Sequence, residues 1–103
     1  MKYIFEVTMK AGFTVEEYAQ GWLEASRIIQ ESAGAQGTYL HRKIGYPDTV
    51  LAIAHWQSKA HRDAKDDVRS EKVRAILARH ARVVSVSVVG EFEDPEWQVL
   101  PNG

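Results

Sequence analysis

The stretch Thr49-Val50-Leu51-Ala52-Ile53-Ala54-His55-Trp56-Gln57-Ser58 decides the fold predicted for this chain. Successive side chains of a strand point to opposite faces, and here both faces are largely apolar. One face carries Leu51, Ile53 and His55, and the other carries Val50, Ala52, Ala54 and Trp56. Such a strand is typical of the middle of a sheet that is covered on both sides. Ser58 can cap a helix, and good helix formers follow it, so we predict a central strand that leads directly into a helix.

The composition predicts one globular domain. The chain has 103 residues, which is enough for one hydrophobic core and too few for two domains. Apolar residues make up 45% of the chain and charged residues 26%, as in ordinary globular proteins. The 13 Lys and Arg residues nearly balance the 14 Asp and Glu residues. With no cationic excess, we expect neither nucleic acid nor an anionic membrane as a partner.

The chain contains no cysteine, which excludes a disulfide framework, a thiolate nucleophile and a zinc–thiolate site. The first residues, Met1–Glu6, include an acid and no long apolar segment, unlike a signal peptide. No apolar run approaches the roughly 20 residues that cross a bilayer. We therefore expect a soluble protein of the cytoplasm.

Further elements are predicted on both sides of the central strand. Residues 2–10 alternate between apolar and polar side chains, which indicates a half-buried strand. Thr14 and Glu17 have the spacing of a capping box and begin a helix with an apolar stripe. Residues 38–46 form a more polar strand, typical of a sheet edge, and Pro47-Asp48 turns it into the central strand.

The second half of the chain predicts a broken helical region and a last strand. Ser58 begins the helical region, and Ser70 has the character of a second cap after a break in the pattern. Residues 81–93 are rich in valine and indicate a well-buried strand. The order strand, helix, strand, strand, helix, strand is that of the ferredoxin-like α+β fold. In that fold both helices cover one face of a four-stranded antiparallel sheet, here within residues 1–93.

The pattern also predicts a homodimer. The second face of a ferredoxin-like sheet has no helices, yet three of the four predicted strands are substantially apolar on both faces. A second copy of the sheet would cover this face, whereas the alternative is a monomer with an exposed and mildly apolar sheet. Residues 94–103 form a tail with Trp97, Val99 and Leu100. We expect this apolar tail to pack, and the surface of a dimer partner is one candidate.

The order of the elements, the chain length and the segment Ala54-His55-Trp56-Gln57-Ser58-Lys59-Ala60 resemble the antibiotic biosynthesis monooxygenase family. That family consists of dimeric α/β barrels, and a Trp two residues before a helix-opening Ser recurs in it, as Trp56 and Ser58 do here. The resemblance covers roughly residues 2–92. It implies the oxidation of polycyclic aromatic molecules without a metal or flavin cofactor, although relatives degrade haem, isomerise lactones or sense small ligands.

Small residues on facing layers predict a cavity between the helices and the sheet. Ala60 and Ala64 face alanines of the central strand or serines of the last strand, depending on the strand register. A pocket of this kind, with aromatic walls and a few polar groups, would suit a planar aromatic ligand. Alternatively, the large side chains simply fill the core. The predicted binding residues are Phe5, Tyr18, Trp22, Ile53 and Trp56, with Arg42 as a carboxylate anchor at the mouth.

His55 is the first candidate for a catalytic base. It shares a strand face with apolar residues, and a partly buried neutral imidazole can take a proton from a phenol or a carbon acid near neutral pH. His61 and Tyr39 are the candidates that would assist it. The alternatives are a structural role for His55 at a strand end or dimer seam, and a solvent position for His61. We expect His41 and His80 to be structural, the latter at a helix end.

The sequence contains no closely spaced His pair, no Gly-rich phosphate loop and no Gly-x-Ser-x-Gly motif. We therefore predict no metal centre, nucleotide site or serine hydrolase. Together with the resemblance, the residues predict a small cofactor-independent monooxygenase for an aromatic or polyketide-type molecule. In it, a base would form a substrate carbanion that reduces dioxygen. The alternatives are a non-catalytic domain that binds or senses a small ligand, and a haem-binding or haem-degrading protein with His61 or His80 as axial ligand.

Overall fold

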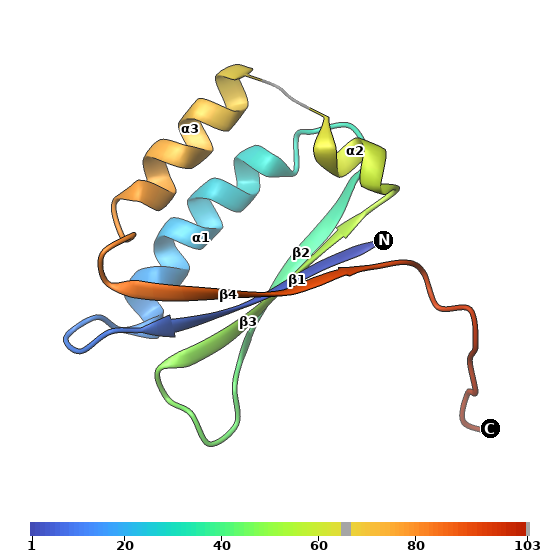
Figure 1. The fold of residues 1–103 in the computed structure, drawn as a ribbon, viewed down its shortest axis with the longest axis horizontal. Helices are drawn as coiled ribbons and strands as arrows, with labels where there is room; N and C mark the ends of the chain where they lie inside the picture. Colours follow the sequence, from blue (N-terminus) through green and yellow to red (C-terminus); the bar gives the residue numbers. More distant parts are fainter. Residues whose placement is uncertain (65–66, 103) are drawn as a thin grey trace.

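One antiparallel sheet of four strands carries helices on one of its two faces (Figure 1). The computed structural model describes the backbone of residues 1–64 and 67–102, and their side chains except those of 67–69. The strand order is β2-β3-β1-β4. The elements are β1 Lys2–Met9, α1 Val15–Ile29, β2 Ala35–Arg42, β3 Thr49–Trp56, α2 Lys59–Asp63, α3 Asp67–Ala78 and β4 Val84–Phe92. This arrangement confirms the predicted ferredoxin-like α+β fold.

β3 lies inside the sheet, between β1 and β2, as its two apolar faces predicted. On the side of the helices, Val50 and Ala52 are each 1% exposed, and Trp56 is also buried. Val50 pairs with Val7 of β1, and both side chains belong to the hydrophobic core. Because burial of a large apolar side chain contributes about 1.5–3 kcal/mol, this pair of strands holds the sheet against the helical layer.

The helix caps predicted at Thr14 and Ser58 are both present. The hydroxyl of Thr14 accepts a hydrogen bond of 3.1 Å from the backbone N–H of Glu17, and α1 begins at Val15, directly after Thr14. The hydroxyl of Ser58 accepts a hydrogen bond of 3.1 Å from the backbone N–H of His61, and α2 follows it. Caps of this kind stabilise a helix start by about 1 kcal/mol, which explains why both helices begin where the sequence predicted.

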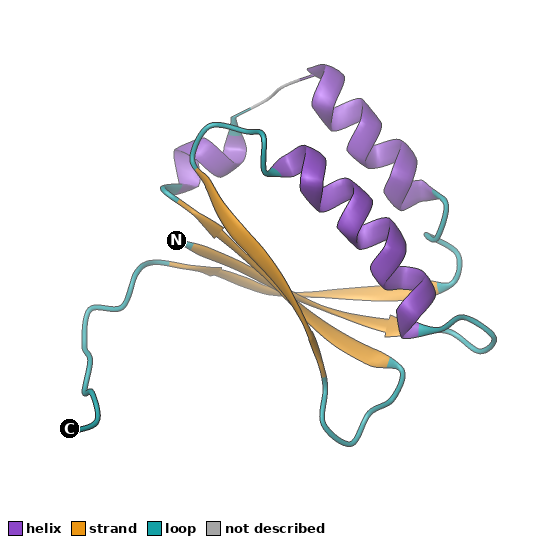
Figure 2. Cartoon of the chain, turned by 180° about the vertical axis from the view of Figure 1, so that it is seen from behind, coloured by secondary structure: helices purple, strands orange, loops and turns teal. Residues whose placement is uncertain are grey.

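The second helical region is divided, as predicted, into the short α2 and the longer α3. The prediction of a second cap at Ser70 is wrong, because the helical backbone of α3 already begins at Asp67. α3 packs beside α1 above the sheet, whereas α2 lies at the end of β3 (Figures 1 and 2). The helical layer over the sheet is therefore made mainly by α1 and α3.

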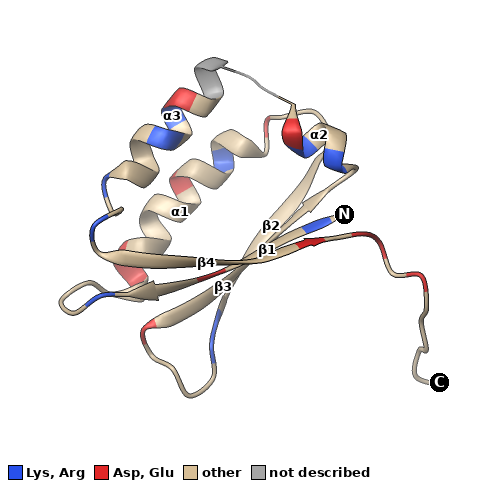
Figure 3. Cartoon of the chain, in the orientation of Figure 1, with Lys and Arg blue, Asp and Glu red and all other residues tan. Residues whose placement is uncertain are grey.

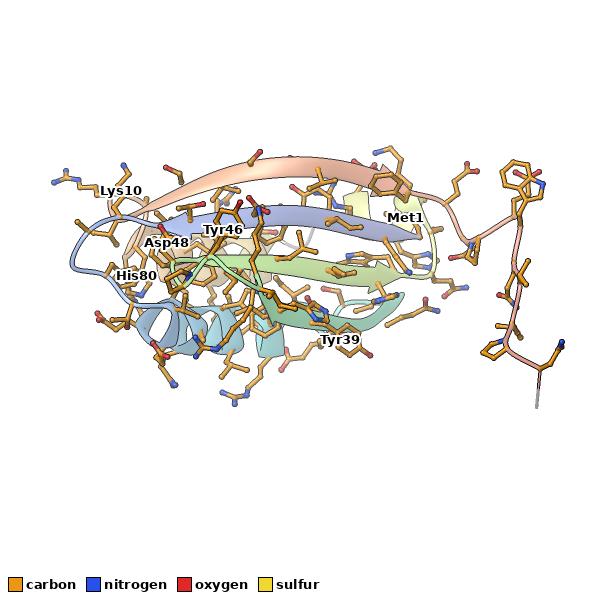
Figure 4. The ribbon with its side chains drawn as sticks, turned by 90° about the horizontal axis from the view of Figure 1, so that it is seen from below. Met1, Lys10, Tyr39, Tyr46, Asp48 and His80 are labelled. Atoms are coloured by element: carbon orange, nitrogen blue, oxygen red, sulfur yellow. The ribbon has the colours of Figure 1, made fainter. Side chains whose placement is uncertain are left out.

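The face of the sheet that carries no helix, which we call the open face, is seen directly in Figure 4. Ile4 of β1 and Leu51 and Ile53 of β3 are half-buried there. Charged residues occupy one end of the face, where Lys43 pairs with Glu6 at 3.2 Å. The open face thus carries a short apolar strip across its two central strands, with charged residues beside it.

A β-bulge interrupts the pairing of β1 with β4. Phe5 pairs with Val88, but the preceding residue, Ile4, pairs with Gly90, so β4 has one additional residue across this step. Gly90 has a φ of +148°, a conformation that L side chains rarely adopt. Beyond the bulge, Glu91 points to the helical side of the sheet, where it pairs with cations of α2.

The tail leaves the domain after β4 and extends away from it (Figures 1 and 2). Asp94 is held by the N-terminal amino group at 2.8 Å, which lowers the pKa of this carboxyl through a hydrogen bond. Beyond it, Trp97 is 84% exposed and Val99 97% exposed. Packing of the tail on a partner stays a prediction. In the part of the chain that the structure describes, no helix is long and apolar enough to span a membrane.

Candidate ligand-binding cavity

A cavity of about 580 Å³, which we call the main cavity, lies between the sheet and the helices. This volume is within the range of small-molecule sites, which are typically about 300–1,000 Å³. Its walls combine aromatic rings with a few hydroxyl groups and charged side chains. They are Tyr3, Phe5, Tyr18, Trp22, Ser26, Ile29, Ser32, Thr38, Ala54, Trp56, Arg62, Asp63, Ala64, Ser70, Val73, Arg74 and Leu77.

A second cavity of about 430 Å³, which we call the α3 cavity, lies between α1, the end of α3 and β4. It shares Tyr18, Trp22, Arg74 and Leu77 with the main cavity. Its other walls are Gly21, Ala78, His80, Ala81, Val84 and Val86. Because the same four side chains border both spaces, a ligand in one cavity would lie against residues of the other.

Tyr18 stands at the junction of the two cavities and is only 6% exposed. Burial raises the pKa of its phenol to about 12. The phenol therefore remains protonated at physiological pH, since the charged form would lose its hydration. It can donate a hydrogen bond to a ligand oxygen but cannot serve as a base.

α2 carries basic and acidic residues (Figure 3), and two of them, Arg62 and Asp63, line the main cavity. The guanidinium of Arg62 lies 4.0 Å from the centroid of the Tyr3 ring and pairs with Asp63 at 3.2 Å and with Glu91 at 3.6 Å. Lys59 adds ion pairs to both acids, at 2.8 Å and 3.0 Å. The hydrogen bond from Lys59 is the main reason that the pKa of Asp63 is lowered. Asp63 is therefore an ionised and paired carboxylate, which makes it a weak base.

Arg74, in contrast, has no ion pair or hydrogen bond with another residue of the described ranges. It projects from α3 at the edge of both cavities and is exposed. Its charge is thus available to an anionic group of a ligand.

Four of the predicted binding residues line the main cavity, namely Phe5, Tyr18, Trp22 and Trp56. Ile53 does not, and this placement corrects the sequence expectation. Even-numbered residues of β3 face the helices, so Ile53 lies on the open face. The strand register, which the sequence left undecided, determines this outcome.

His55 lies on the open face for the same reason, and the backbone of β3 separates it from the main cavity. Tyr39 of β2 lies beside it, with the two rings edge to face and their centroids 5.3 Å apart. The structure therefore brings these two candidate catalytic residues together, but it corrects the expectation that they share a space with the aromatic binding residues.

His61 and Arg42 also lie outside the described walls of both cavities. The Nδ1 atom of His61 is 2.7 Å from the hydroxyl of Ser58, so the imidazole belongs to the cap of α2. Arg42 donates a hydrogen bond of 2.6 Å to Glu16, which is the largest cause of the lowered pKa of that carboxyl. The expectation that Arg42 anchors a ligand at the cavity mouth is thus corrected, because its guanidinium is engaged at the surface.

His80 is the histidine that does line one of the two cavities; the sequence favoured a structural role for it, with a haem ligand as the alternative. Its ring stacks at a tilt on Phe13, with the centroids 4.8 Å apart. A sequence signal that could have pointed to this contact is Gly21, a helix-weakening residue in the middle of the first predicted helix. Within the described residues, no three His, Asp or Glu side chains gather into a group suited to a metal ion.

Solved structures with this fold include oxygenases. SnoaB from Streptomyces nogalater, a cofactor-independent oxygenase, has a TM-score of 0.71 at 14% identity, over 98% of this chain and 96% of its own. An antibiotic biosynthesis monooxygenase has a TM-score of 0.60 at 10% identity, over 90% and 100% of the two chains. Rv0793 from Mycobacterium tuberculosis has a TM-score of 0.64 at 10% identity, over 90% and 96%.

No protein-family model matches the sequence, and no curated protein is similar to it in sequence. The resemblance inferred from the residues is therefore carried by the three-dimensional structure. At that level it is confirmed, since this chain has the fold of the antibiotic biosynthesis monooxygenases.

Proposed function

We propose that this protein is a small cofactor-independent monooxygenase that acts on a planar aromatic or polyketide-type molecule. The main cavity is the observation that carries the proposal, because five aromatic side chains border a space of about 580 Å³. Offset stacking and edge contacts with such rings favour flat aromatic ligands. The fold shared with SnoaB, a cofactor-independent oxygenase, supports the same reaction class.

The reaction begins with loss of a proton from an activated C–H group of the substrate. The resulting carbanion passes one electron to dioxygen, and the two radicals combine into a peroxide. Loss of water from the peroxide leaves a carbonyl group, so a CH₂ group and one O₂ become a C=O group and one H₂O. The protonated phenol of Tyr18 supports this scheme, since it can donate a hydrogen bond to a substrate oxygen as negative charge develops.

We also propose that the protein is a homodimer joined through the open face. The half-buried Ile4, Leu51 and Ile53 support this, because they form an apolar strip that a second sheet would cover. In such a dimer His55 and Tyr39 would lie at the seam. Their proposed roles as base and helper would then require a ligand that reaches this seam rather than the main cavity.

Oxygen uptake with a panel of anthrones and quinols tests the enzymatic proposal. Ala54 lines the main cavity, so Ala54→Leu should fill part of it and abolish both uptake and quenching of tryptophan fluorescence by the substrate. Ala60→Leu makes the same change on the exposed side of α2 and should leave both unchanged. Uptake by Ala54→Leu at the wild-type rate, in a folded variant, would refute the assignment of the main cavity as the site.

A ligand-binding domain without catalysis is the second candidate. It is favoured by the ionisable groups that line the main cavity among the described residues, which are Tyr3, Tyr18, Arg62, Asp63 and Arg74 and include no histidine. If anthrones and quinols quench the tryptophan fluorescence in a saturable way while the protein consumes no oxygen with any of them, this second function replaces the first.

A further inference from the structure

The imidazole of His80 has free nitrogens in the α3 cavity. No ring nitrogen of His80 forms a hydrogen bond with another described residue. Every fully buried side-chain nitrogen or oxygen in the described part of the chain does have a partner. Because the residue lines the α3 cavity and its ring nitrogens have no described partner, they are available to exchange a proton with a ligand there.

The surroundings hold this ring in place. Phe13 stacks against it at 4.8 Å between centroids. On α1, a Cβ atom added at Gly21 would be 3.1 Å from His80 Cδ2 and 3.2 Å from Nε2, closer than favourable contact distances of about 3.5–4.0 Å. Glycine in a helix interior costs about 1 kcal/mol relative to alanine. At this position it permits the close approach of the imidazole.

Arg74 supplies an unpaired positive charge to the same cavity. The other ionisable group there is Tyr18, which stays protonated because it is buried. Outside the cavity, Arg79 and Arg82 flank His80 in sequence, and Arg79 is neutralised by an ion pair with Glu24 at 3.0 Å. The charges around the ring are therefore mainly positive, which favours an anion beside it.

We propose that His80 accepts a proton from an acidic hydroxyaromatic ligand, and that Arg74 stabilises the anion that results. This inference rests on the proposed function and places an acid–base group in the α3 cavity, which shares four walls with the main cavity. The O–H or activated C–H bond of the ligand breaks, and its electron pair stays on the ligand. The proton forms an N–H bond with a free nitrogen of His80. The products are an imidazolium and a ligand anion, so the total charge is unchanged.

An anaerobic binding experiment tests the proton transfer without any oxidation. The probe is 1,8-dihydroxyanthrone, whose neutral and anionic forms absorb differently. Wild-type protein near neutral pH should bind it as the anion, and the ¹⁵N chemical shifts of His80 should change to those of an imidazolium when the probe binds. This NMR measurement needs no variant and decides the proposal even if substitutions disturb folding.

Variants then separate the two residues. His80→Gln should bind the probe in its neutral form, yet keep the wild-type affinity for 9-anthracenemethanol, which has no acidic proton. Arg74→Gln should weaken binding of the anion about tenfold, and Arg74→Lys should restore most of it. His61→Gln is the matched control, because His61 lines neither cavity, and it should behave as wild type.

The outcomes for this inference and for the proposed function can be told apart. Binding of the neutral probe by wild type, no binding at all, or an anion in His80→Gln equal to that in wild type would each overturn the role of His80. In air, His80→Gln should lose at least about 100-fold in the rate of oxygen uptake, with loss of the acidic limb of the pH profile. Anion formation by wild type without oxygen uptake would refute the oxygenase and leave the proton acceptor in place.

Discussion

Raising the pH above 10 should destabilise this protein through Tyr18. The phenol has a pKa of about 12 in the folded protein against 10.0 for a free tyrosine side chain. The folded-state pKa is the higher one, so the unfolded chain loses its proton first as the pH rises. The contribution of this protonated phenol to stability is complete below about pH 10 and is lost as the pH rises toward 12.

The size of the loss follows from the difference of about two pKa units. Each unit corresponds to about 1.4 kcal/mol, so the free energy of unfolding should fall by about 1.4 kcal/mol at pH 11 and by at most about 2.7 kcal/mol at higher pH. Tyr18 is only 6% exposed, so solvent screening reduces this value little. For a domain whose whole stability is about 5–15 kcal/mol, this is a readily measured fraction.

Urea denaturation of wild type and Tyr18→Phe, followed by tryptophan fluorescence at about pH 9 and pH 11, measures this loss. The Phe variant keeps the ring and removes the ionisable group, and Tyr18 has no hydrogen bond to another described residue through its hydroxyl. All other ionisable side chains are present in both proteins, so their effects cancel in the difference. If the free energy of unfolding falls by the same amount in wild type and in Tyr18→Phe between these pH values, burial does not raise the pKa of the phenol and the reasoning is wrong.

Three further predictions concern other parts of the molecule. Val50→Ala should lower the free energy of unfolding by about 2–3 kcal/mol, because two buried methyl groups are lost and a cavity remains, and thermal denaturation should show a fall in Tm of roughly 10 °C or more. Removal of residues 95–102, which extend away from the domain, should leave the unfolding free energy of a single chain nearly unchanged but weaken self-association in sedimentation velocity. His55→Ala should likewise weaken self-association while ligand quenching of tryptophan fluorescence stays at the wild-type level, and a loss of quenching would return His55 to the ligand site.

The fold could be predicted from the sequence because each of its signals acts locally. The apolar run of residues 49–56 and the caps at Thr14 and Ser58 depend on neighbouring residues alone, and the structure has the corresponding strand and helix starts. The aromatic residues of the predicted first strand and helix, such as Phe5 and Trp22, face the cavity because each of these elements has a single mainly apolar face, which packs against the other layer.

The central strand has no single apolar face, so the sequence could not predict which of its two faces would meet the helices. Both sides of β3 are apolar, so its period of two is compatible with either orientation. The packing of the helices selects the side with Ala52 and Ala54, and this places Ile53 and His55 on the open face. His80 was missed for a different reason, because its function depends on its approach to Gly21, a residue nearly sixty positions away in the chain.

The bulge between β1 and β4 has a consequence for both surfaces of the sheet. If the same residues of β4 paired without the bulge, Glu91 would lie opposite Lys2, and its carboxylate would turn away from α2. The ring of Phe92 would turn the opposite way, toward the helices. The extra residue at this step, Val89, therefore keeps the acid on the helical side and the aromatic ring on the open face. The bulge, rather than the kind of residue, determines which surface receives the negative charge.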